Sequence, residues 1–208
     1  MSSRAELTEP TGVRSARRFR AAAVFGLVLG VSLMSGCGAP FNISPKAAVP
    51  SLTNMPEAHT GGLVFQAQPV TDQDFLYDAF NSNPIMAGIF PVWVRITNSG
   101  GSPAGLEKAE FLLTGADSTY KPFEPSKAFK RLLKYYQIKA SSTFGFRKSK
   151  DDFESTALDL TKPILAGSSR EGYVFFSVPA EPGIRDDRLK LLVKKVSADH
   201  SETVEISF

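Results

Sequence analysis

The stretch IFPVWVRIT, residues 89–97, is the clearest β-strand in this chain of 208 residues. It is made mostly of β-branched and aromatic residues, and its proline stands near the start, where a strand tolerates one. The turn-forming cluster NSGGSP follows at residues 98–103 and ends the strand. Trp93, in the middle of the stretch, predicts a large apolar anchor in the core of a β-sandwich. The stretch therefore favours a fold built on antiparallel strands.

Short apolar runs on both sides of this strand predict further strands, separated by turns rich in Gly, Pro and Ser. Their number and brevity favour a mainly β fold, an antiparallel β-sandwich. The alternation of strands and long helices that a parallel sheet needs is missing. Fourteen Pro and 16 Gly agree with a chain of many turns. The other expected strands lie at residues 63–70, 106–114, 117–123, 156–165, 173–178, 189–196 and 203–208.

Two segments have the residue spacing of short inserted helices. The first runs from Thr71 to Phe80, and we expect Thr71 to cap its N-terminus. The second, SKAFKRLLKYYQ at residues 126–137, has apolar residues at positions i, i+3, i+4 and i+7. Its basic residues fall on the remaining arc, which predicts an amphipathic helix with a cationic outer face. We take these four cations as a candidate surface for an anionic ligand: Lys127, Lys130, Arg131 and Lys134.

Positive charge is concentrated in two places. Residues 1–37 contain five Arg and two Glu, which accounts for the whole net charge of +3 and leaves the rest of the chain formally neutral. Within that rest, residues 121–150 carry nine basic side chains and one acidic side chain. A basic pI that arises from an N-terminal segment does not indicate a nucleic-acid partner. We expect residues 121–150 to be either a solvated face or a surface for anionic lipid, an anionic ligand or an envelope protein.

The N-terminal segment predicts an export signal. Four arginines precede an uncharged run at residues 21–34. As a helix this run would span about 21 Å, less than the roughly 30 Å of a hydrocarbon core. A basic region, a short apolar region and then small residues are typical of a secretory signal. The general secretory route is favoured, and the pair Arg17-Arg18 leaves twin-arginine export as an alternative.

This segment ends in Leu33-Met34-Ser35-Gly36-Cys37, which resembles the lipobox of bacterial lipoprotein precursors, with Met34 where the family prefers leucine. The resemblance implies that residues 1–36 are a signal peptide and that Cys37 is lipidated, which anchors the protein in a membrane. Cys37 is the only cysteine, which excludes an internal disulfide framework. The residue after the cysteine is Gly38 and not Asp, and in this respect the chain resembles lipoproteins that are sent to the outer membrane. We therefore expect a lipid-anchored envelope protein, at the outer membrane facing the periplasm if the source has two membranes.

Four prolines and no periodicity predict that residues 38–60 form a tether. Fully extended, this segment would reach about 75 Å. The expected organisation is a signal peptide at residues 1–36, the lipidated cysteine and Pro-rich tether at 37–60, and one β-sandwich domain at 61–208.

The order of strands and turns over residues 61–208 resembles bacterial secreted or lipid-anchored immunoglobulin-like domains, often grouped as telokin-like or as domains of unknown function. The resemblance implies an immunoglobulin-like antiparallel β-sandwich. It supplies no catalytic residues, and the helix at residues 126–137 departs from the simplest form of that fold. The residues that carry the resemblance are 92–98, 111–113, 120–122, 165–167 and 172–179.

No motif for phosphate, dinucleotide or zinc-protease chemistry occurs in the sequence, and no G-x-S-x-G is present. The acidic groups at residues 72–78, 151–154 and 186–187 lack the spacing of a calcium loop. We therefore expect no catalytic residue, metal or cofactor. The leading hypothesis is a non-enzymatic binding or envelope-interaction module. Anionic membrane-surface or anionic-ligand binding through residues 126–137 and an unrecognised periplasmic hydrolase are the alternatives.

Overall fold

A computed structural model describes residues 41–46, 48–51, 53–140, 143–180, 188–196 and 202–208. They lie in one compact unit that begins at Ala39. The expected signal peptide at residues 1–36 and the expected lipidation site Cys37 lie outside the described residues.

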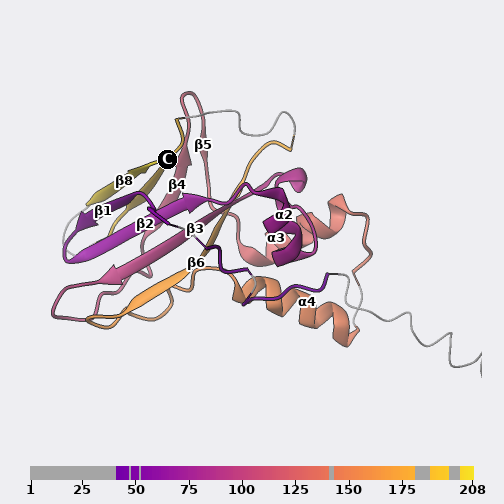
Figure 1. Cartoon of the computed structure of the whole chain (residues 1–208), viewed down its shortest axis with the longest axis horizontal. Coiled ribbons are helices and arrows are strands. Elements are labelled where there is room, and N and C mark those ends of the chain that lie inside the picture. The colour runs from indigo at the N-terminus through magenta and orange to yellow at the C-terminus, as the bar shows by residue number, and fades with distance from the viewer. Residues whose placement is uncertain (1–40, 47, 52, 141–142, 181–187, 197–201) are drawn as a thin grey trace, which may run out of the picture. The chain divides into compact units, whose positions relative to one another are not determined.

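The described chain is mainly β, with two four-stranded antiparallel sheets and three α-helices (Figure 1). The first sheet has the order β1-β2-β3-β6, and the second has the order β5-β4-β7-β8. This confirms a mainly β protein with two facing antiparallel sheets. The strands are β1 (Glu57–Thr60), β2 (Leu63–Pro69), β3 (Ile89–Asn98), β4 (Glu110–Thr114), β5 (Thr119–Tyr120), β6 (Ser169–Ser177), β7 (Lys190–Lys194) and β8 (Thr203–Ser207). The helices are α2 (Gln73–Phe80), α3 (Pro125–Tyr135) and α4 (Phe144–Ser155), with a short 3₁₀ helix at Pro84–Ala87.

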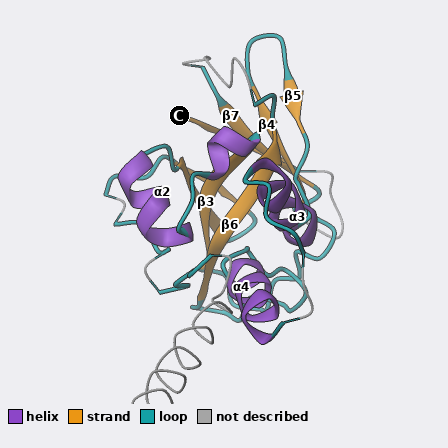
Figure 2. Cartoon of the chain, turned by 90° about the vertical axis from the view of Figure 1, so that its right-hand side faces the viewer, coloured by secondary structure: helices purple, strands orange, loops and turns teal. Residues whose placement is uncertain are grey.

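Strand β3 determines how the layers stack. Every residue from Ile89 to Val94 is buried, whereas half-buried and buried residues alternate from Arg95 onward. Side chains such as Val92 pack into the core between the two sheets. Ile89 and Trp93, on the opposite face, pack into a second core with residues of the helices. The helices cover this outer face of the first sheet (Figure 2), which gives three layers: helices, first sheet and second sheet.

The second core consists largely of aromatic rings. Phe153 of α4 stacks on Phe175 of β6 with ring centroids 4.8 Å apart. Trp93 meets Tyr173 edge-on at 4.9 Å and is buried as expected, but it packs in this helix-covered core and not between the two sheets, where an anchor of the sandwich was expected. Burying one such large side chain stabilises a fold by roughly 1.5–3 kcal/mol. The outer face of β3 at residues 89–94 is therefore buried only when the helices cover it.

The segment that precedes β1 closes one side of this aromatic core. We call the described residues 41–46, 48–51 and 53–56 the N-terminal strap. Phe41, Ile43 and Ala48 in the strap are each at most 3% exposed. The buried hydroxyl of Tyr173 donates a hydrogen bond to the Ala48 carbonyl at 2.7 Å. Burial of this phenol raises its pKa well above the usual value. The strap is therefore part of the folded unit.

The expected tether over residues 37–60 is wrong from Phe41 onward. The strap is packed on the helical layer, and β1 pairs with β2 in an antiparallel register that matches Glu57 with Gln66. The sequence pattern misled because the strap contributes its apolar residues one at a time, between prolines, and has no strand or helix periodicity. The folded unit thus begins about twenty residues before the expected boundary at residue 61.

Two expected helices are confirmed, with one correction. Helix α3 matches the amphipathic segment expected at 126–137, and α2 matches the segment expected after Thr71. The N-cap of α2 is Asp72, whose carboxylate accepts from the backbone N–H of Phe75 at 2.8 Å. Asp caps at least as well as Thr, and here it stands directly before the first helical residue.

Residues 144–165 differ most from expectation. Helix α4 was not expected, because its inward face consists of the half-buried Phe146 and the buried Ser149 and Phe153, which make only a weak apolar stripe. The strand expected at 156–165 is absent from the described chain, where isolated bridges at Ala157 and Ile164 replace it. Asp159 accepts a hydrogen bond from the backbone N–H of Thr161 and bends the chain between those bridges.

The free edge of β6 is covered by these irregular segments. Phe123 and Leu158 each donate a backbone hydrogen bond to a β6 carbonyl, at 2.7 and 2.9 Å. Unpaired strand edges invite association, so covering them keeps the sheet closed. The backbone approaches so closely that a Cβ atom on Gly172 would lie 2.6 Å from the nitrogen of Leu158. Glycine is therefore required at this position of β6.

Replacement of this glycine tests the covered edge. We expect Gly172→Ala to destabilise the domain by about 1–3 kcal/mol, because backbone atoms must move to admit the methyl group. The matched control is Gly101→Ala, where an added Cβ meets nothing within 4 Å. That substitution should stay within about 0.5 kcal/mol of the parent. Thermal unfolding of both variants checks the prediction, and equal midpoints would contradict the close approach.

Candidate functional site

The four expected cations all lie on α3, and three of them lie opposite its buried face. Ala128, Phe129, Leu132 and Leu133 of this helix are buried in the aromatic core. The side chains of Lys127, Lys130 and Lys134 are exposed. Because α-helices turn once in about 3.6 residues, these three lysines share one stripe along the helix. The structure therefore brings together three of the four cations on an open surface.

Arg131 has a different role from the lysines. Its side chain is half-buried, and one guanidinium nitrogen donates to the Gly88 carbonyl at 3.0 Å and to the Ser177 hydroxyl at 2.8 Å. The guanidinium also lies 4.8 Å from the centre of the Phe123 ring, in cation–π geometry. Arg131 therefore fastens α3 to the start of β3 and the end of β6. These contacts tie it to the fold, in contrast to the three lysines.

Several of the other cations are compensated locally. Lys127 pairs with Glu124 at 2.9 Å. Hydrogen bonds from the Ser126 hydroxyl and from Lys127 lower the pKa of the Glu124 carboxyl. On α4, Lys148 pairs with Asp152, and Lys150 pairs with Glu154 at 3.1 Å. The excess of nine basic residues over one acidic residue at 121–150 is thus partly balanced by carboxylates that follow directly after residue 150.

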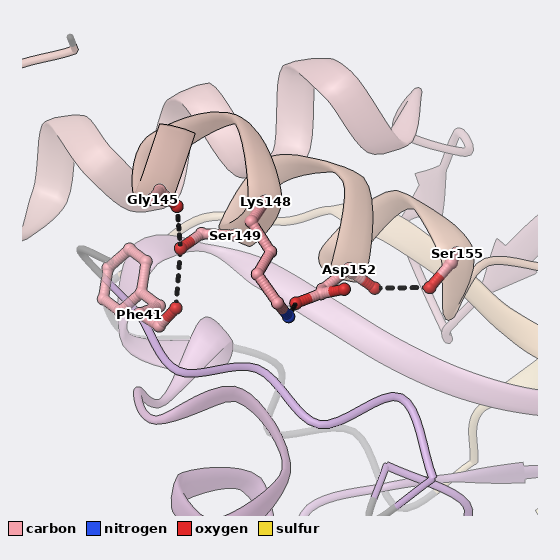
Figure 3. A network of polar contacts seen from close by, with 6 residues as sticks. All are labelled: Phe41, Gly145, Lys148, Ser149, Asp152 and Ser155. Carbon is pink, nitrogen blue, oxygen red and sulfur yellow. Dashed lines mark hydrogen bonds and ion pairs between the residues drawn. The ribbon is translucent and has the colours of Figure 1, made fainter. Parts of the chain in front are cut away.

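The N-terminal strap meets α4 at a buried polar contact (Figure 3). The Ser149 hydroxyl donates to the Phe41 carbonyl at 2.7 Å and also lies 3.0 Å from the Gly145 carbonyl. Phe41 itself packs edge-on against Phe129 and Tyr136 of the α3 side, with centroids 6.2 and 5.8 Å apart. The described chain therefore enters the domain between the end of α3 and the start of α4.

The end of the sandwich away from the helices is a cluster of loops organised by Asn98. This side chain is 1% exposed, and its amide nitrogen donates to the carbonyls of Ser102 and Ile164 at 2.8 and 2.9 Å. Its amide oxygen accepts from the Gly100 N–H at 2.9 Å. Asn98 therefore holds the loop after β3 against the loop that leads to β6. The sequence showed only a turn at this position.

An open cleft of about 230 Å³ lies at this loop end. The turn between β1 and β2, the segment Pro103–Gly105 and the residues Val196 and Glu202 line it. The Thr60 hydroxyl donates to the Glu202 carboxylate across the cleft. The cleft is therefore rimmed by loops from both sheets and carries one polar pair beside apolar walls.

None of the described helices combines the length and the apolar character needed to cross a membrane. The described part of the chain also has no cluster of three or more His, Cys, Asp or Glu side chains arranged to hold a metal ion.

No family model matches the chain, and no curated protein sequence matches it. Among solved structures it is similar to a Bacillus subtilis protein provisionally described as a lipoprotein, with 13% identity and a TM-score of 0.42. That match covers 75% of this chain and 39% of the other, so this chain spans about two fifths of that protein.

Two further solved structures are similar at the same level. One is a functionally unknown Listeria monocytogenes protein, with 13% identity, a TM-score of 0.40 and coverage of 73% and 80% of the two chains. The other is a conserved hypothetical protein from Bacillus anthracis, with 14% identity, a TM-score of 0.33 and coverage of 71% and 90%. Likenesses at this level do not support the transfer of a function to this chain.

The different roles of neighbouring cations on α3 lead to a stability prediction. We expect Arg131→Ala to destabilise the domain by roughly 1–3 kcal/mol, because it removes the hydrogen bonds to the Gly88 carbonyl and the Ser177 hydroxyl and the contact with the Phe123 ring. Lys130→Ala on the exposed stripe should change stability by less than about 0.5 kcal/mol. Denaturant unfolding of the two variants measures the difference. Equal losses would contradict the structural role of Arg131.

Proposed function

We propose that this chain is a lipid-anchored, non-enzymatic binding module of the cell envelope, which meets its partner through the loop end organised by Asn98. The observation that carries the proposal is the arrangement of the two ends of the domain. The chain that leads from Cys37 enters at the helical end, and the cleft of about 230 Å³ lies at the loop end. An anchor at Cys37 leaves the loop end free to face a partner.

The sandwich itself is proposed to be immunoglobulin-like. In that fold one sheet contains strands A, B and E, and the other contains C, F and G, with C′ beside C in the variable type. Strands β2-β3-β6 correspond to A-B-E, and β5-β4-β7-β8 correspond to C′-C-F-G. Helices α3 and α4 stand in the chain between C′ and E, where the usual fold has strand D. Sandwiches of this type gather their loops at two ends, which supports the loop end as the binding surface.

The anchor is testable by changing its single reactive atom. We expect the mature protein to carry a diacylglyceryl thioether on Cys37, because a thiol is the group that forms that bond. Cys37→Ser should therefore abolish lipid attachment. The protein should then lose the membrane binding that depends on the acyl chains. Mass spectrometry of the N-terminal peptide and fractionation of cells measure both effects. An unmodified cysteine in the membrane-bound protein would contradict the proposal.

The binding surface is tested by photocrosslinking in cells. A photoreactive residue in place of Leu165, which is 63% exposed at the loop end, should give discrete crosslinked products. The same residue in place of exposed Asp78 on α2 is the matched control and should give none. Products from the α2 position alone would refute the loop-end assignment. Turnover of a hydrolase substrate that is lost on one substitution in the domain would refute the non-enzymatic assignment.

A further inference from the structure

We infer that the corner where α3 leads into α4 rests on the membrane and binds a layer of anionic lipid headgroups. We define the α3–α4 corner by its described residues, 134–140 and 143–147. The inference deepens the proposed function and depends on the lipid anchor at Cys37. It names the face of the domain that the anchor brings to the bilayer and the lipid charge that this face prefers.

The described chain starts at Phe41, which is held between α3 and α4. Phe41 is 3% exposed, and its carbonyl accepts a hydrogen bond from Ser149 in the second turn of α4. Its ring packs on Tyr136, directly after the end of α3 (Figure 3 shows Phe41 beside α4). Phe129 of α3 in turn packs on Phe146 of α4 at 5.8 Å. Phe41 is therefore fixed to both helices at the α3–α4 corner.

Only a short length of chain separates Phe41 from Cys37. The two residues are four positions apart, and consecutive Cα atoms are 3.8 Å apart, so they are separated by at most about 15 Å. This limit holds for any path of the intervening residues. A lipid on Cys37 therefore keeps the corner within reach of the headgroups, and the expected stand-off of about 75 Å is not available.

The α3–α4 corner carries positive charge. Lys134, Lys139 and Arg147 are exposed, and none of them makes an ion pair with a described residue. The described residues of the corner include no acidic residue. Each cation close to an anionic leaflet strengthens binding by about fivefold. The corner therefore presents three available cations to the lipid surface, whereas Arg131 and Lys127 of the initially expected set are engaged within the protein.

The corner also contains two exposed aromatic side chains. Tyr135 is 42% exposed and Phe144 is 77% exposed, the latter at the first position of α4. Aromatic rings concentrate at the boundary between headgroups and acyl chains, and neighbouring Lys or Arg residues pair with the anionic groups. A water-exposed Phe144 is unfavourable in solution, and contact with lipid removes that cost.

The experiment uses the full lipidated protein in vesicles whose acyl chains carry bromine, which quenches tryptophan fluorescence at short range. The probe is Phe144→Trp, and the matched control is Leu165→Trp at the opposite, loop end of the sandwich. Native Trp93 is 4% exposed and adds the same background to both variants. The vesicles contain phosphatidylcholine alone or phosphatidylcholine with phosphatidylglycerol.

We expect strong quenching of Trp at position 144 on the anionic vesicles and none at position 165. Quenching at 144 should fall in phosphatidylcholine vesicles, at high salt, and in the variant Lys134→Gln/Lys139→Gln/Arg147→Gln. Equal quenching at both positions, or quenching at 165 alone, overturns the corner as the contact. If the quenching at position 144 is the same on anionic and neutral vesicles and at low and high salt, the preference for anionic headgroups is overturned.

Mass spectrometry of the same samples separates this inference from the proposed function. If Cys37 carries no lipid and the protein does not stay with the vesicles, the anchor itself is wrong and both proposals fail. If Cys37 is lipidated and Trp at 144 is not quenched, the anchor stands and only the corner is wrong. This second result is the one expected if the corner binds a partner protein instead of lipid headgroups.

Discussion

The two-sided burial of strand β3 is the constraint on which the rest of the structure depends. A strand with one buried face alternates apolar and polar residues, whereas residues 89–94 are buried without interruption. One face of this run is buried against the second sheet, and the apolar side chains of the other face must be buried by other parts of the chain. Helices α2, α3 and α4 and the N-terminal strap supply that cover. Beyond Val94 the outer face becomes polar, and Arg95 pairs with Glu171 at 2.7 Å in the open half of the sheet.

The helical cover also determines which end of the domain lies next to the proposed lipid anchor. Because the strap seals the aromatic core, the chain is fixed at Phe41, and the anchor proposed at Cys37 is only four residues away. In the attachment that we propose, the helical end is tied to the lipid surface, and the loop end organised by Asn98 is directed away from it. The charge distribution follows the same division. On α4, Asp152 and Glu154 pair with Lys148 and Lys150. The cations at the α3–α4 corner, in contrast, form no ion pair with a described residue.

The sequence predicted those elements whose residues carry a strong period. Strand 89–97 and the helix at 126–137 lie within one or two residues of their expected bounds, since β-branched runs and an i, i+3, i+4, i+7 stripe are local signals. Helix α4 was missed because Ser149 occupies a buried position and is satisfied by the Phe41 carbonyl, a contact 108 residues away in sequence. The strap was taken for a tether because its apolar residues are isolated and find partners only in the assembled core. The division of the α3 cations also depends on tertiary contacts, since only the fold brings Gly88 and Ser177 to Arg131.

The most direct test of this account is amide hydrogen exchange in the N-terminal strap of the mature, lipidated protein. The Ala48 N–H donates to the Ser44 carbonyl at 3.0 Å, and the Ser44 N–H donates to the Ala79 carbonyl at 3.4 Å. Since the strap seals a buried core, both amides should exchange far more slowly than in an unfolded peptide, and strand β3 should be protected as well. Exchange of residues 41–50 at the rate of an unfolded chain, with β3 still protected, would show a free tether and contradict the account.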